Sequence, residues 1–388
     1  MIDRILIVRL GALGDIVHAL PAAAALREAF PDARIDWLVS SRHRAFLEQV
    51  GPVAPGGRAL IDRRIVLERR KSTSGAFLAS WKRRPSDGEP LFLTEAIGLL
   101  RKADYDIAFD MQGLMKSAVL ARSSGARRVV GFSTSHLRER WAHLFYTETV
   151  DPPEAVHVIE KNLALLEAVG LRDVQKKMPM LGAAAREAEG GRREAEGGRR
   201  EEAEGGRREA DGDRRPDDRT SGRPDFVIVN PGAGWPNKRW PPEWFGAIAR
   251  RIHAKYGLET LALWGPGEEA LARVVVAASN GAARLAPPTD IGAMIALIAD
   301  AALFIAGDTG PLHIAAAVGT PIVGLYGPTN PARNGPWHPA DIALSRFAGC
   351  ECHYRRRCLR EACCLLDITV DDVMAAAERR LGAPSPHA

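Results

Sequence analysis

The sequence predicts an α/β protein made of two Rossmann-like domains, each a doubly wound parallel sheet, that face each other across a cleft. Short continuous apolar runs alternate with helix-like segments in both halves of the chain, which is typical of parallel strands covered by helices on both faces. A charged low-complexity segment at 183–224 separates the halves. With 388 residues in total, the chain has enough residues on each side of that segment for a domain of ordinary size.

The domain limits follow from this change in composition. We expect a first domain at 1–182, a second domain at 225–366, and a closing helix and tail at 367–388. The segment 183–224 repeats Arg-Glu-Ala-Glu-Gly-Gly-Arg with small variations, and more than half of its residues are charged. Such a composition cannot bury enough apolar surface to offset its ordering entropy, so we expect a linker.

The two halves show the same alternation of strands and helices. In the first half, strands are expected at 5–8, 35–39 and 107–109, with a helix at 16–30. Strands of the second half are expected at 226–229, 260–264, 303–306 and 322–325. Helices of the second half are expected at 244–256, 268–279, 291–298, 312–318 and 368–381.

Charge and cysteine usage narrow the class of protein. Lys and Arg number 53 against 48 Asp and Glu, a formal net charge of +5. The basic excess is concentrated at 58–84, which suits phosphates of a nucleic acid, a nucleotide or an anionic lipid, or else forms a solvated loop. Signal-peptide features and bilayer-spanning apolar runs are absent from the sequence, and the five cysteines are confined to 350–364. We therefore expect a cytoplasmic protein.

The first turn of the first half carries a carboxylate. Gly11, Gly14 and Asp15 follow the strand at 5–8, but Arg9 stands where a dinucleotide fingerprint needs its first glycine. Asp15 either caps the following helix or faces the cleft as a candidate general base, and the spacing leaves both interpretations open. Asp36 imitates the ribose-binding acid of an NAD site, so an oxidoreductase is an alternative, although Asp15 would repel a pyrophosphate.

The second half has a better phosphate site. Asp308, Thr309, Gly310 and His313 surround Pro311 at the start of a helix. Backbone N–H groups around Thr309 and Gly310, together with the helix dipole, would face an anion. Asp308 suits ligand hydroxyls, and His313 can donate to a phosphate oxygen. A plain proline-initiated helix would explain the proline and glycine, but not the aspartate and histidine beside them.

Two further segments of the second half add charge to this site. Lys238 and Arg239 follow a Pro- and Gly-rich loop that begins at Asn230, and they can stabilise a diphosphate leaving group or simply decorate a surface loop. Glu268 and Glu269 follow the next strand, where either carboxylate can bind a ribose diol.

Taken together, these motifs resemble glycosyltransferase family 9. The matching residues are Arg9-x-Gly11-Ala-Leu-Gly14-Asp15, Asp110-Met-Gln112-Gly113-Leu-Met-Lys116-Ser117, Asn230-Pro-Gly232 and Asp308-Thr-Gly-Pro-x-His313. The resemblance implies a GT-B fold and an inverting lipopolysaccharide heptosyltransferase, closest to the heptosyltransferase I branch. Such an enzyme moves L-glycero-D-manno-heptose from ADP-heptose to a Kdo sugar of lipid A, in peripheral contact with the inner membrane.

The resemblance also implies roles for individual residues. Asp15 matches the catalytic base, while Gln112 and Lys116 fall in the acceptor-domain motif. The donor-binding positions are Lys238, Glu268 (with Glu269 as the alternative register), Asp308, Thr309, Gly310 and His313. Neither a cofactor nor a metal is required, and no nucleic acid partner is expected. The closing helix is expected to cross back to the first domain. Hydroxyl residues that related sequences often carry are replaced here by Ala233 and Gly234.

Some alternatives stay open. Cys350, Cys352, Cys358, Cys363 and Cys364 are dense, but their spacing fits a structural zinc site poorly, so disulfides or metal-free packing are favoured over zinc. The enzyme could also use another nucleotide-sugar or a later core acceptor. From a different class, a nucleotide-binding protein without transfer activity remains an alternative.

Overall fold

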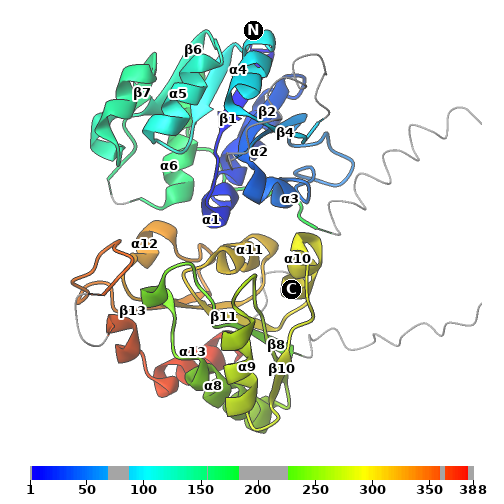
Figure 1. Ribbon diagram of the computed structural model, residues 1–388, viewed down its shortest axis with the longest axis vertical. Helices are drawn as coiled ribbons and strands as arrows, with labels where there is room; N and C mark the ends of the chain where they lie inside the picture. Colours follow the sequence, from blue (N-terminus) through cyan, green and yellow to red (C-terminus); the bar gives the residue numbers. More distant parts are fainter. Residues whose placement is uncertain (1, 69–86, 155, 183–225, 359–362, 383–388) are drawn as a thin grey trace, which may run out of the picture.

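The structure, a computed structural model, describes residues 2–68, 87–154, 156–182, 226–358 and 363–382. Two parallel sheets, each covered by helices, lie one above the other (Figure 1). The predicted linker at 183–224 and the end of the tail lie outside the described residues. Among the described helices, none combines the length and apolar character that crossing a bilayer requires.

The first sheet has seven parallel strands in the order β4-β3-β2-β1-β5-β6-β7. The strands are β1 Arg4–Val8, β2 Arg34–Ser40, β3 Arg63–Leu67, β4 Pro90–Leu91, β5 Ile107–Asp110, β6 Arg128–Phe132 and β7 Glu148–Val150. Ile5 of β1 pairs with Ile35 on one side and with Ile107 on the other. The chain therefore starts in the middle of the sheet, and its topology switches direction between β1 and β5.

The second sheet repeats this plan with six parallel strands in the order β10-β9-β8-β11-β12-β13. The strands are β8 Phe226–Asn230, β9 Glu259–Ala262, β10 Ala283–Leu285, β11 Leu303–Gly307, β12 Ile322–Tyr326 and β13 Ile342–Ser345. The first strand again lies in the middle, with its switch point between β8 and β11. The doubly wound α/β fold predicted for both halves is thus confirmed.

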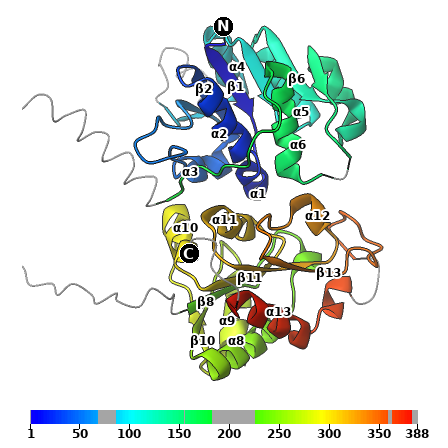
Figure 2. The same ribbon diagram turned by 180° about the vertical axis from the view of Figure 1, so that it is seen from behind.

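Helices cover both faces of the first sheet. They are α1 Leu13–Val17, α2 Leu20–Ala29, α3 Arg44–Leu47, α4 Leu93–Lys102, α5 Met115–Ser123 and α6 Val158–Ala164, with 3₁₀ turns η1 Ser41–His43, η3 Thr134–His136, η4 Arg140–Phe145 and η5 Leu165–Val169. In Figure 1, α4 and α5 lie in front of the sheet, and Figure 2 shows α2 and α6 on the opposite face. The single helix predicted at 16–30 is split into α1 and α2. Pro21, which lacks an N–H to continue a helix, lies in the first turn of α2.

The second sheet is covered in the same way. Its helices are α8 Pro242–Tyr256, α9 Glu269–Ala278, α10 Ile291–Ala299, α11 Gly310–Val318, α12 Pro331–Asn334 and α13 Val370–Gly382, with 3₁₀ turns η6 Pro236–Lys238 and η7 Cys364–Asp367. Side chains of β8 alternate between the two layers: Val227 and Val229 pack with α8, whereas Ile228 packs in the cluster that contains residues of α10 and α11. The α10 and α11 side faces the first domain (Figure 1).

The closing helix belongs to the second domain. Helix α13 packs against α8, β12 and β13, so the implied crossing back to the first domain is wrong for the described residues. An ion pair fixes this position: Arg380 Nε donates to Asp341 Oδ1 at 2.9 Å, with side-chain exposures of 0% and 3%. Burial raises the pKa of Asp341, while the hydrogen bond from Arg380 lowers it.

Removing Arg380 tests this anchor. Arg380→Ala would leave Asp341 as an uncompensated buried charge, which costs about 3–5 kcal/mol of unfolding free energy. The control is Arg379→Ala, whose side chain is exposed on the same helix, and which is expected to change stability by no more than about 0.5 kcal/mol. Chemical unfolding followed by circular dichroism measures both; equal effects would contradict the anchoring role.

Candidate active site between the two sheets

The predicted site residues gather where the carboxyl ends of the two sheets face each other. The segments that follow β1 and β5 contain Asp15, which lies in α1, and Gln112, and the segments that follow β8 and β11 contain Lys238, which ends η6, and Asp308. Each pair of loops flanks the switch point of its sheet. Open α/β sheets bind ligands at this position because the loops on either side diverge and leave a crevice.

Two glycines allow the domains to approach closely. A Cβ atom on Gly14 of α1 would lie 2.2 Å from His313 Cδ2 in α11, and one on Gly310 would lie 2.9 Å from Leu13 Cδ2. Any larger side chain at either position would push the two helix starts apart. The beginnings of α1 and α11 are therefore in direct contact across the domain boundary.

Asp308 is the centre of a buried polar cluster in the second domain. Lys238 Nζ donates to Asp308 Oδ2 at 2.5 Å, Asn334 Nδ2 donates to Oδ1 at 2.9 Å, and His313 Nε2 lies 3.1 Å from Oδ1. Burial alone would raise the pKa of Asp308, but the hydrogen bond from His313 and the Lys238 charge outweigh it and hold the pKa well below its ordinary value. The Asp308 carboxylate thus orients three neighbouring polar groups.

Lys238 is held from a second side as well. Its ammonium lies 4.4 Å from the centroid of the Trp235 ring, a cation–π geometry. The backbone of β11 approaches closely too, because a Cβ atom on Gly307 would lie 2.4 Å from the Lys238 carbonyl oxygen. The lysine is therefore fixed beside the end of β11, where Asp308 begins the next loop.

The start of α11 offers backbone donors beside this lysine. The helix begins at Gly310, directly after Thr309, and Pro311 lies in its first turn. The Thr309 hydroxyl oxygen is buried and has no hydrogen-bond partner among the described residues. The N–H groups at a helix start, together with its dipole, form a ready anion site.

Asp15 has the contact expected of a helix-capping residue and also the exposure expected of a candidate general base. Its Oδ2 accepts a hydrogen bond from Ala12 N at 3.1 Å, as a capping residue would. Its Oδ1 lies 2.9 Å from Arg9 Nη2, and the side chain of Asp15 remains 44% exposed whereas that of Arg9 is 7% exposed. The capping contact and the ion pair thus orient the carboxylate without covering it.

Three histidines meet at the domain boundary. His18 follows Asp15 by one helical turn, and its ring centroid lies 4.5 Å from that of His313 and 5.2 Å from that of His157. Both ring nitrogens of His18 are buried without a partner among the described residues. Burial, followed by the nearby His313, lowers the pKa of His18 well below its ordinary value. Burial therefore disfavours the charged form of His18, and sequence reasoning missed this cluster.

The two neighbouring glutamates, Glu268 and Glu269, lie in different surroundings. Glu268 lies against the loop after β8, since a Cβ atom on Gly232 would be 2.1 Å from Glu268 Oε2. Glu268 Oε2 also accepts a hydrogen bond from Gly265 N at 3.3 Å. Glu269, by contrast, pairs with Arg273 one turn along α9. Only Glu268 is thus placed beside the loops at the switch point.

With this geometry established, comparison with known proteins identifies the family. Residues 96–363 match the model of glycosyltransferase family 9 (heptosyltransferase). The chain belongs to this family. It is therefore a glycosyltransferase, as its sequence motifs indicated.

The relatives of this glycosyltransferase match it over nearly their whole length. Lipopolysaccharide heptosyltransferase 1 of Pseudomonas aeruginosa is 27% identical over 360 residues, 93% of this chain and 87% of the relative. Lipopolysaccharide heptosyltransferase 3 of Escherichia coli is 25% identical over 374 residues, 95% of this chain and 96% of the relative. The solved structure of E. coli heptosyltransferase WaaC with ADP matches with a TM-score of 0.66 at 20% identity, covering 97% of this chain and 99% of that one. This likeness confirms the GT-B-type fold.

On the first domain of the glycosyltransferase, the residues of the motif at 110–117, predicted to serve the acceptor, have different structural roles. Gln112 Oε1 accepts a hydrogen bond from Leu10 N at 2.8 Å and so joins the loops after β1 and β5. Lys116 is exposed on α5. Asp110 is buried and accepts hydrogen bonds from Ser117 Oγ at 2.9 Å and from Tyr146 Oη at 2.8 Å. These contacts show that part of the motif maintains the loop, while Lys116 points outward.

Asp36 does not form the ribose site of a dehydrogenase. It lies within β2, where Arg34 Nε donates to its Oδ1 at 2.8 Å and Tyr105 Oη donates to its Oδ2 at 2.6 Å. The side chain is fully buried. The oxidoreductase alternative therefore lacks the acid that suggested it.

The cysteines form a thiol cluster beside the Lys238 loop. All five are thiols; Cys350, Cys352 and Cys364 are buried, and Cys363 Sγ lies 3.4 Å from the Asn237 carbonyl oxygen. Within the described residues, no group of three or more His, Cys, Asp or Glu side chains is arranged to hold a metal. Disulfides, one of the two favoured interpretations, are absent from this cluster. Metal-free packing stays a prediction and zinc stays an alternative, because residues 359–362 lie outside the described part.

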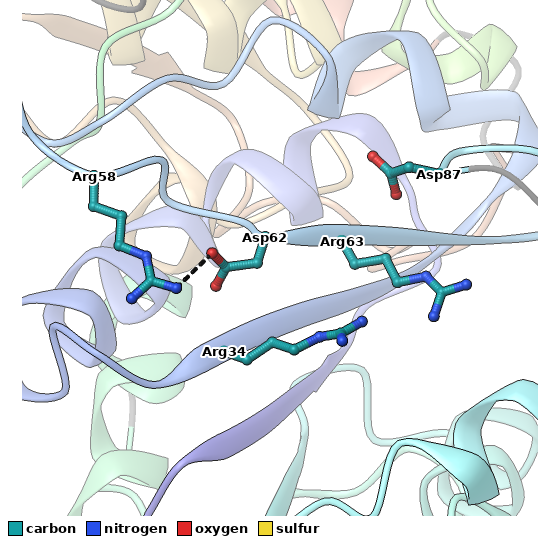
Figure 3. Close-up of a pocket in the computed structure, with 5 residues that line it drawn as sticks. All are labelled: Arg34, Arg58, Asp62, Arg63 and Asp87. Carbon is teal, nitrogen blue, oxygen red and sulfur yellow. Dashed lines mark hydrogen bonds and ion pairs between the residues drawn. The ribbon is translucent and has the colours of Figure 1, made fainter. Parts of the chain in front are cut away.

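The described part of the basic block lies away from the site. Arg34, Arg58, Asp62, Arg63 and Asp87 line a pocket of about 420 Å³, and Figure 3 shows how these five side chains lie. All five residues lie at the amino end of a strand or in the segment just before it, the strands being β2, β3 and β4. This edge of the sheet is opposite the edge that carries the loops after β1 and β5. Arg58 pairs with Asp62 at 3.0 Å. Residues 69–84 of the block lie outside the described residues.

The close approach at Gly14 can be tested directly. Gly14→Ala places a methyl group within the His313 ring, so the domains must separate at this point, and we expect sugar transfer to fall by about a hundredfold. Gly98→Ala is the control, because a Cβ atom there meets nothing within 4 Å. Initial rates and the radius of gyration from X-ray scattering measure the effect. Unchanged values in Gly14→Ala would show that the contact is not required.

Proposed function

We propose that this glycosyltransferase moves L-glycero-D-manno-heptose from ADP-heptose to a Kdo residue of the lipopolysaccharide inner core, with inversion at the anomeric carbon. The observation that carries the proposal is the placement of an exposed carboxylate, Asp15, across the domain boundary from Lys238, His313 and the start of α11. The relatives named as lipopolysaccharide heptosyltransferases and the matching structure with ADP support this choice of substrates.

The second domain would bind the donor. Lys238, the N–H groups at Thr309 and Gly310, and His313 would contact the diphosphate, and the Glu268 carboxylate would accept hydrogen bonds from the ribose hydroxyls. Asp308 already holds Lys238 and His313 in place. Donors that are oriented before the bond breaks stabilise the departing diphosphate without further reorganisation. In this scheme no metal is needed to neutralise the leaving group.

The first domain would position the acceptor. Asp15 would accept the proton of the acceptor hydroxyl while its oxygen attacks the anomeric carbon from the side opposite the diphosphate. Arg9, which contacts Asp15, would orient this base. Gln112 and Lys116 would lie on the acceptor side, where the ammonium of Lys116 suits a Kdo carboxylate or a lipid A phosphate.

Analysis of the product tests the proposed reaction. Incubation with ADP-heptose and Kdo–lipid A in the presence of a chelator should yield ADP and an acceptor heavier by one heptose, detected by mass spectrometry. A matched reaction supplies an acceptor that already carries heptose, because heptosyltransferase 3 is also among the relatives. If heptose is transferred only to the acceptor that already carries heptose, the enzyme acts on a later core sugar and not on Kdo.

Two substitutions separate binding from turnover. Asp15→Asn should lower the transfer rate by about 10²–10⁴-fold, since general base catalysis contributes that much, while ADP still raises the thermal unfolding midpoint. Lys238→Met should instead reduce the protection by ADP. Lys255→Met, on the surface of the second domain, is the control for loss of a lysine. Normal turnover in Asp15→Asn would remove Asp15 from the base role, and protection by NAD rather than ADP would overturn the transferase proposal.

A further inference from the structure

One hydrogen bond joins the two domains in the part of the chain that the structure describes. His157 Nε2, in the first domain, lies 3.0 Å from the carbonyl oxygen of Gly335 in the second domain. The contact connects the residue just before α6 with the residue just after α12, and these two helices face each other across the boundary in both views (Figure 1 and Figure 2). No step of the proposed transfer uses this contact, and each of its ends leads to a different part of the site.

The direction of this hydrogen bond follows from the other nitrogen of the His157 ring. Ile159 N donates to His157 Nδ1 at 3.2 Å, so Nδ1 acts as an acceptor and carries no proton. In a neutral imidazole the proton then lies on Nε2, which donates to the Gly335 carbonyl oxygen. Burial lowers the pKa of His157 and favours this neutral form. One ring thus caps the start of α6 and binds the opposite domain at the same time.

The first-domain end of the contact is fixed to the helix that carries the proposed base. Asn162, also in α6, donates from its Nδ2 to the His18 carbonyl oxygen at 2.9 Å. His18 is the residue at which α1 ends, and α1 contains Asp15. The His157 ring also packs edge-on against the His18 ring, with the two centroids 5.2 Å apart. The position of His157 is therefore tied to that of Asp15.

The second-domain end of the contact is fixed to the proposed donor site. Gly335 N donates to the Pro331 carbonyl oxygen at 2.7 Å, and a Cβ atom on Gly335 would lie 2.5 Å from that oxygen, so this turn is tightly packed. Asn334, the preceding residue, donates from its Nδ2 to Asp308 Oδ1 at 2.9 Å. Asp308 in turn contacts Lys238. The accepting carbonyl group is therefore one residue away from a side chain that holds the centre of the polar cluster.

Aromatic rings from both domains surround the contact. The ring centroid of Trp337, in the second domain, lies 6.2 Å from that of His157 and 5.9 Å from that of His18. His313 packs against His18 from the same side of the boundary as Trp337. Rings packed in this way limit the access of water, and a hydrogen bond is stronger where the local dielectric is low. Because the rings come from both domains, they can pack like this only when the domains are close together.

We propose that His157 is a positioning residue for sugar transfer, because its hydrogen bond to Gly335 holds the domains together with Asp15 facing the proposed donor site. This inference rests on the proposed function, which assigns the base and the diphosphate to opposite domains. His157 touches neither substrate in that scheme. It sets how often the two halves of the site are assembled. Removing its donor group should therefore slow turnover without weakening the binding of ADP, which needs the second domain alone.

Two substitutions separate the contact between domains from the capping of α6. His157→Asn keeps an oxygen that can cap the helix, but its side chain is too short to reach Gly335. His157→Gln places an amide nitrogen near the position of Nε2 and restores a donor, although it loses the cap. We expect kcat to fall about three- to tenfold in His157→Asn, as the loss of one hydrogen bond predicts, and to recover most of its value in His157→Gln. The thermal unfolding midpoint of His157→Asn and its increase with ADP should not change.

X-ray scattering of the chain without substrates measures the same contact independently of the reaction. The radius of gyration should increase in His157→Asn and return toward its original value in His157→Gln. If both kcat and the radius of gyration are unchanged in His157→Asn, or if kcat simply follows the unfolding midpoint in the two variants, His157 is not a positioning residue. An unsubstituted chain that transfers sugar to neither acceptor would contradict the proposed function, whereas scattering would still decide whether His157 holds the domains together.

Discussion

The contact between the starts of α1 and α11 is the constraint on which the rest of the site depends. Each helix begins just after the central strands of its sheet, and Gly14 and Gly310 allow the two to touch. Through that contact, His313 of the second domain lies beside His18 of the first. His313 in turn contacts Asp308, which holds Lys238. A change in the separation of two helices therefore changes the distance between the proposed base and the proposed phosphate cradle.

Burial gives the two aspartates of the site different properties. Both lie near the start of a helix that follows a central strand, but the side chain of Asp308 is 5% exposed and that of Asp15 is 44% exposed. Asp308 is surrounded by donors, and their combined effect lowers its pKa even though burial opposes ionisation. It is suited to fixing Lys238 and His313, not to exchanging a proton. Asp15 is restrained on one side by Arg9 and open on the other, as a base that must receive an acceptor proton requires.

Sequence reasoning predicted what depends on local pattern and missed what depends on distant contacts. Buried parallel strands are continuous apolar runs, so most of the central strands and the four loops of the site were predictable. The break between α1 and α2 and the preference for Glu268 over Glu269 required packing information. His18 and Asn334 were missed because their partners, His313 and Asp308, come from separate elements. Asp36 misled the search, because a ribose-binding acid and a buried strand acid occupy similar sequence positions.

The distribution of polar atoms at the domain boundary suggests why the two domains are built differently. On the proposed donor side, Lys238 and His313 are already engaged by Asp308, so a diphosphate would meet groups whose orientation is set before it arrives. On the proposed acceptor side, Lys116 and Asp15 remain exposed, as the approach of the proposed lipid-linked sugar would require. His18 is buried beside His313 at the boundary, where burial lowers its pKa well below the ordinary value and so disfavours a positive charge. The asymmetry matches a reaction in which the diphosphate stays with one domain while the sugar passes to the other.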